Sequence, residues 1–134
     1  MFTKPKNGWV NLEIGDFRER ASYLTDIPND CLDTFIFALQ NNIPASVYFD
    51  AEGWDYYLIS SFYRTFIIIN KEKPELFTFE KDYEEIAKEL IIDFEENIDE
   101  WVNWECWHGK SEEEFKENKV NLITKINKLK SLIE

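Results

Sequence analysis

The chain has few of the residues that most often build catalytic and metal sites. It contains one histidine, His108, and two cysteines, Cys31 and Cys106. A P-loop, a dinucleotide-binding glycine motif, a nucleophile elbow, an HExxH zinc motif and a pair of CxxC motifs are all absent from it. Every mechanism that requires histidine is therefore limited to one position. We expect a protein that is not an enzyme and that carries neither a cofactor nor a metal.

Long apolar runs and an excess of basic residues are missing too. No stretch approaches the ~20 apolar residues that span a bilayer, and Lys4 and Lys6 are not followed by the apolar run of a signal peptide. The formal net charge of −12 disfavours binding to nucleic-acid phosphates and to anionic lipid. Because both cysteines are interpreted as reduced thiols, we expect a cytoplasmic protein. The charge and the absence of long apolar runs lead us to expect neither nucleic acid nor membrane as a partner.

The chain is nevertheless rich in residues that form a core. Hydrophobic residues make up 44% of the sequence and aromatic residues 16%, whereas a disordered acidic segment would have few of either. No linker rich in glycine and serine divides the chain. Residues 1–134 are therefore predicted to form a single domain.

The apolar residues follow strand and helix periodicities in turn. Period-two patterns predict strands at 8–14, 17–24, 45–50, 54–61, 64–70 and 75–80, the first two forming a hairpin around Gly15-Asp16. Helical spacing predicts helices from Asp26 to about residue 41, from Asp82 to about residue 107, and from the capping box at Ser111 onward. The order ββαββββαα predicts an α+β domain, in which two or three helices cover an antiparallel meander of about six strands.

One predicted turn brings three carboxylates close to a tryptophan. Asp50, Glu52 and Asp55 surround Gly53-Trp54. They could line a cleft or bind Ca²⁺, but the EF-hand spacing is absent, and we favour a plain acidic turn between two strands.

Aromatic residues crowd the same region and recur near residue 104. Tyr57 follows Tyr56 directly, so in a strand the two rings face opposite sides of the sheet. Tyr57 and Trp9 are therefore candidates for a face that the helices leave uncovered. Most of the other large rings must be buried, but exposed Trp and Tyr are preferred anchors of protein interfaces. The candidate anchors are Trp54, Tyr57 and Trp104.

The negative charge is concentrated in one segment. Residues 80–105 hold eleven acidic residues and two lysines, which is −9 of the total of −12. This pattern fits either a solvated helix face or a surface that steers a basic partner into contact. On this segment the candidate pairing residues are Asp93, Glu96 and Glu100, which add to Asp50, Glu52 and Asp55 in the turn.

Glu105 and His108 have the ExxH spacing that di-iron carboxylate bundles use twice. Here the motif occurs once, so half of the ligand set has no source. We expect His108 to lie in the last turn of a helix, where a cation suits the helix dipole.

Several short segments resemble those of small bacterial proteins that are similar to immunity proteins, which are encoded beside polymorphic or contact-dependent toxins. The segments are Gly8-Trp9, residues 14–17, 21–26 and 49–54, and Trp101-Val102-Asn103-Trp104. The resemblance implies an acidic inhibitor that binds a basic toxin domain, for example a nuclease, and occludes its active site. It implies no catalytic residue.

Two alternatives remain open at the level of sequence. One is a small-molecule or metal-binding enzyme that uses the 52–55 turn or the Glu105/His108 pair. The other is a homo-oligomeric structural protein that self-associates through the last amphipathic helix, 115–133. For the inhibitor, we expect a monomer or a weak homodimer.

Overall fold

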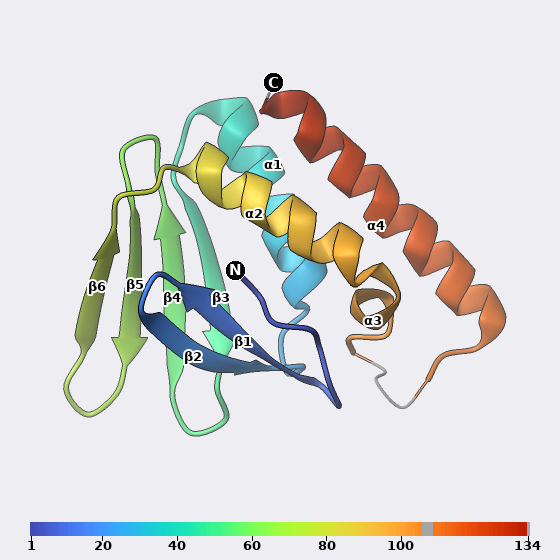
Figure 1. The fold of residues 1–134 in the computed structure, drawn as a ribbon, viewed down its shortest axis with the longest axis horizontal. Helices are drawn as coiled ribbons and strands as arrows, with labels where there is room; N and C mark the ends of the chain where they lie inside the picture. The colour runs from blue at the N-terminus through green and yellow to red at the C-terminus, as the bar shows by residue number, and fades with distance from the viewer. Residues whose placement is uncertain (106–108, 134) are drawn as a thin grey trace.

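A computed structural model describes residues 1–105 and 109–133 (Figure 1). Within these residues the chain folds as an α+β domain with a two-stranded and a four-stranded antiparallel sheet, so the predicted fold class is confirmed. The six strands fall into two sheets, and the first helix lies between the hairpin and the meander in the sequence. None of the described helices is long and apolar enough to cross a membrane.

The N-terminal hairpin consists of β1 (Trp9–Ile14) and β2 (Phe17–Ser22), as the alternation predicts. Ile14 pairs with Phe17 across the two-residue turn, where Gly15 has a φ of +57°. Glycine adopts this left-handed conformation without steric cost. The apolar side of the hairpin packs into the core, where Val10, Leu12 and Ala21 are at most 3% exposed.

Helix α1 (Ile27–Asn41) begins beside Pro28 and ends where the sequence indicates. Asn42 adopts the left-handed conformation (φ 53°, ψ 45°), and its N–H donates to the carbonyl of Ala38. Asparagine tolerates this conformation at a helix C-terminus. Pro44 follows at the next turn and prevents continuation of the helix.

The meander runs β3 (Ala45–Asp50), β4 (Asp55–Ser60), β5 (Thr65–Asn70) and β6 (Glu75–Phe79), with each strand paired to the next. The helices lie to one side of this sheet (Figure 1). The side chains that face them are at most 3% exposed: Val47, Phe49, Tyr56, Leu58, Ile67 and Ile69.

The prediction of one long helix from Asp82 to about residue 107 is wrong in its second half. Asp82 caps α2 (Tyr83–Glu96) by accepting the N–H of Glu85, but the helix ends at Asn97, whose φ is −123° and ψ is 40°. A short helix, α3 (Ile98–Val102), follows in a new direction. This break buries Trp101, Val102 and Trp104 to 3% exposure or less.

Helix α4 (Glu112–Leu132) packs across α1 and α2. Ser111 caps it and accepts the N–H of Glu114 at 3.2 Å, which confirms Ser111 as the N-cap. Its core-facing side chains, Leu122, Ile126 and Leu129, repeat at helical spacing and are at most 4% exposed.

Candidate functional site: an open sheet face

The side of the four-stranded sheet that faces away from the helices carries a continuous set of apolar and aromatic side chains. Register places Tyr48, Tyr57, Ile68 and Leu76 opposite one another in one row across all four strands. Ile59 and Phe66 form part of the next row, and Asp50 and Asp55 form part of the row on the other side. We call these eight residues the open sheet face.

The open sheet face is accessible, although its composition resembles that of a buried surface. Tyr57 is 43% exposed, Ile68 37% and Leu76 62%. Strand β5 reads Phe66-Ile67-Ile68-Ile69, an unbroken apolar run that is typical of strands covered on both faces. Only one face is covered by the described part of the chain. Contiguous exposed apolar surface of this kind marks interaction sites.

Two aspartates mark one end of the open sheet face. Asp50 pairs directly with Asp55 across β3 and β4, an arrangement in which like charges repel. Asp50 accepts the backbone N–H of Glu52 at 2.7 Å, and Asp55 accepts the hydroxyl of Tyr48 at 2.9 Å. The ring of Tyr48 lies 5.2 Å from that of Tyr57, centroid to centroid. Carboxylates and phenol rings therefore adjoin one another on the same surface.

The turn that carries these aspartates is held by an arginine from the hairpin. Arg20 in β2 donates from Nε to the carbonyl of Ala51 at 2.8 Å and from its guanidinium to the carbonyl of Glu52 at 3.2 Å. Its guanidinium carbon lies 4.4 Å from the Trp54 ring centroid, and Lys71 Nζ lies 4.8 Å from the same centroid. Trp54 is thus half-buried and in contact with two cations.

We expect Arg20→Met to lower the free energy of unfolding by about 1–2 kcal/mol, because it removes charged hydrogen bonds to two carbonyls and a cation–π contact. Urea denaturation measures the change. Arg18→Met on the same strand is the matched control, since Arg18 makes a solvent-exposed ion pair with Glu13 and should cost less than ~0.5 kcal/mol. Equal losses from both variants would show that the contacts to the turn contribute nothing specific.

The hydroxyl of Tyr48 should ionise at a higher pH than that of an ordinary tyrosine. Partial desolvation, followed by the hydrogen bond to Asp55, raises the pKa of its hydroxyl from 10 to about 12. A raised pKa in the folded state means that the stabilisation is complete below pH 10 and is lost as the pH rises through about 12. Tyrosinate absorbance of the wild type should therefore include one late transition. Asp55→Asn should shift that transition to lower pH, and its absence in Tyr48→Phe would assign it.

Five of the nine residues predicted to bind a partner come together in this region. Asp50, Asp55 and Tyr57 belong to the open sheet face itself. Glu52 and Trp54 lie in the adjoining β3–β4 turn, where Glu52 adopts a φ of +55° and offers its carbonyl to Arg20.

Trp104 and Asp93 have structural roles instead. Trp104 is 2% exposed, and its indole N–H donates to the carbonyl of Thr25 at 2.8 Å. The carboxylate of Asp93 accepts the backbone N–H of Phe2 at 2.8 Å and lies 3.1 Å from the N-terminal ammonium group of Met1. The expectation that these two residues serve a partner is corrected, because their polar groups are already bonded within the fold.

The acidic segment is less free than its charge suggests. Glu100 lies 3.3 Å from Lys4, while Glu96 is exposed on α2. Three further carboxylates of the segment pair with lysines at 2.6–3.0 Å: Glu89 with Lys81, Glu95 with Lys130, and Asp99 with Lys119. Helix α4 supplies two of these lysines, so packing neutralises part of the surface that the sequence predicts as a docking face.

Sequence reasoning missed most of the open sheet face. Tyr48, Ile59, Phe66, Ile68 and Leu76 were not among the predicted binding residues. The signal was present in β5, whose apolar residues occupy both faces of the strand. That pattern is typical of strands covered on both faces, whereas the predicted helices cover one.

The described residues offer little for metal or thiol chemistry. They contain no group of three or more His, Cys, Asp and Glu side chains that could hold a metal ion. Cys31 is fully buried, and burial raises the pKa of its thiol, which therefore stays protonated and unreactive. The predictions for Cys106 and His108 fall outside the described residues.

The chain matches no family model, no curated protein and no solved structure in the comparisons made.

Proposed function

We propose that this chain is a non-catalytic protein-binding module, an immunity-type inhibitor that binds a basic toxin domain, for example a nuclease, and occludes its active site. The observation that carries the proposal is the open sheet face. It combines exposed tyrosine, isoleucine and leucine side chains with the paired carboxylates of Asp50 and Asp55. Aromatic and apolar anchors beside a charged rim are the usual anatomy of a protein interface.

The charge on this face favours a basic partner. Its strand residues include no lysine or arginine, and two cations from neighbouring segments, Arg20 in β2 and Lys71 after β5, lie over the Trp54 ring. The net charge of −12 adds a long-range field that accelerates encounter with a positively charged protein. Affinity would then depend on burial of the apolar rows, because exposed ion pairs contribute little.

Co-expression with the product of the neighbouring gene tests the proposal. A tagged chain should capture a basic domain in stoichiometric amounts, and cells that express this domain should survive only when the chain is present. The activity of the purified domain should be inhibited in the complex. It should return after the two proteins are separated under denaturing conditions and the domain is refolded alone. Absence of a cognate partner together with absence of rescue would contradict the proposal.

A further inference from the structure

Strand β6 forms an unpaired edge of the four-stranded sheet. Figure 1 shows it as the outermost strand, with β5 on one side and no element of the described chain on the other. The opposite edge strand, β3, contacts both β2 and α1. A free edge presents a row of backbone donors and acceptors that can pair with another strand. Pro74 precedes the strand and Glu75 begins it, but residues 76–79 include no charged residue, proline or bulge that would protect this edge.

The register of the sheet identifies the backbone groups on the free edge. In the β4–β5 turn the N–H of Ser61 donates to the carbonyl of Arg64 at 2.9 Å. Hydrogen-bonded and non-hydrogen-bonded pairs alternate along antiparallel strands. Counting from this turn, the odd-numbered residues of β5 bond to the odd-numbered residues of β6. Leu76 and Thr78 therefore direct their N–H and C=O groups outward, away from β5.

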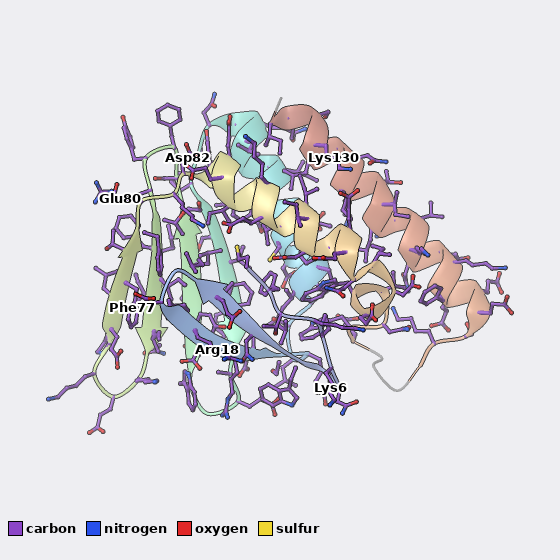
Figure 2. The ribbon with its side chains drawn as sticks, in the orientation of Figure 1. Lys6, Arg18, Phe77, Glu80, Asp82 and Lys130 are labelled. Atoms are coloured by element: carbon purple, nitrogen blue, oxygen red, sulfur yellow. The ribbon has the colours of Figure 1, made fainter. Side chains whose placement is uncertain are left out.

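An aromatic groove adjoins this edge. It has a volume of about 350 Å³ and is lined by Asp16, Phe17, Phe77, Thr78 and Phe79. The ring of Phe17 lies 5.0 Å from that of Phe77 and 6.0 Å from that of Phe79, centroid to centroid, so the hairpin turn forms one wall and β6 the other. Phe77 lies along β6 in Figure 2. A strand added to β6 would place alternate side chains over this groove.

The charges around the edge select the kind of strand. Asp16 lines the groove, Glu75 begins β6, and Glu80 follows its end (Figure 2). A second copy paired antiparallel through β6 would bring the glutamates of the two chains close together, which is unfavourable. An added strand with basic ends would instead pair with them.

The neighbouring lysines do not cancel this preference. Lys81 is bonded to both carboxylate oxygens of Glu89, at 3.0 and 3.1 Å, and Lys71 lies on the Trp54 ring. Lys73 lies in the turn before β6 and is the remaining cation at that end. The groove itself is lined by one carboxylate and no cation.

We propose that the free edge of β6 and the adjoining groove bind an extended segment of the partner, with apolar side chains at alternate positions and basic residues at its ends. The segment adds a fifth strand to the meander, and Leu76 and Thr78 supply its backbone hydrogen bonds. The site is continuous with the open sheet face, to which Leu76 also belongs. The identity of the natural partner, a basic toxin domain, is the part of this inference that rests on the proposed function.

Thr78→Pro is the decisive variant. Proline removes the outward N–H of Thr78, whereas the bonds to β5 come from the odd-numbered neighbours, and proline is tolerated at such edge positions. Thr78→Val is the matched control, because it keeps the N–H and the strand preference. The probe is the capped peptide Arg-Val-Thr-Val-Thr-Val-Arg, titrated into the full chain while amide chemical shifts are recorded.

The peptide should shift the amide signals of Leu76, Thr78 and Phe17 in the wild type and in Thr78→Val. Thr78→Pro should keep the overall spectrum of the fold but bind about tenfold more weakly, as the loss of a backbone hydrogen bond implies. A peptide with glutamate in place of arginine should bind more weakly to every variant. Absence of shifts at β6, or equal binding by Thr78→Pro and Thr78→Val, would overturn the inference.

Binding measurements with the captured toxin domain distinguish failure of this inference from failure of the proposed function. If the domain binds the wild type and Thr78→Pro equally, the open sheet face suffices, and only the strand addition is refuted. If the peptide binds at β6 but no toxin domain is captured, the edge site stands and the proposed function fails.

Discussion

Replacing Tyr57 and Ile68 together with alanine is expected to weaken binding of the proposed basic partner by about a thousandfold. The two side chains are directly opposite each other in the central strands of the open sheet face. Interface anchors of this kind cost about 2 kcal/mol or more each when truncated, and 4 kcal/mol corresponds to roughly three orders of magnitude in Kd. Calorimetric or surface-based titration of the purified partner measures the loss.

The same double variant should fold normally. Tyr57 and Ile68 are 43% and 37% exposed, so their truncation removes strand propensity rather than core packing. Val120→Ala with Ile123→Ala on α4 is the matched control, since these residues are apolar and exposed at 66% and 41% but lie on a different surface. Equal loss of affinity in both double variants, or none in either, would place the interface elsewhere.

Trp101→Ala is expected to destabilise the protein by about 3–5 kcal/mol, the largest effect we expect on stability from one substitution. The side chain is 1% exposed, and its ring centroid lies 5.0–5.4 Å from those of Phe2, Phe94 and Trp104. Truncation therefore leaves a cavity where the N-terminus, α2 and α3 meet. The midpoint of urea denaturation reports the change, and Ile92→Ala on the exposed side of α2 should leave it nearly unchanged.

A pair of conservative variants separates packing from hydrogen bonding at this cluster. The indole N–H of Trp101 has no hydrogen-bond partner among the described residues, whereas that of Trp104 donates to the carbonyl of Thr25. Trp104→Phe loses this bond and leaves the carbonyl of the half-buried Thr25 without it, which costs about 1 kcal/mol beyond the packing change. Trp101→Phe incurs the packing change alone. A larger loss for Trp101→Phe would contradict this account.

Local patterns predicted most of the secondary structure. The hairpin turn at Gly15, the start of α1 beside Pro28 and the N-cap at Ser111 are short-range features. Each depends on the backbone preference of one residue or on one side chain that accepts a nearby N–H. The end of α2 was not predictable in this way. Helical spacing continues past Asn97, and the break there becomes favourable only when Trp101 and Trp104 reach a core built by distant segments.

The candidate site was predictable in part. The turn with Asp50 and Asp55 could be located from its composition, and the alternation of β4 placed Tyr57 on the face opposite Tyr56. Which face the helices cover was not encoded locally, so the rows that contain Ile68 and Leu76 emerged only from the register of four strands. The role of Arg20 was also hidden, since it reaches a turn some thirty residues away.

The sequence by itself determined the sign of the charge, the element types and the scarcity of catalytic residues, because each of these depends on composition or on neighbours along the chain. Only the tertiary structure decided which charges and aromatic rings remain available. Packing of α4 brings lysines onto carboxylates of the acidic segment, and the break after α2 buries the tryptophans. One face of the meander then stays open, because the helices lie on the other side and long-range packing selects which of two apolar faces is covered.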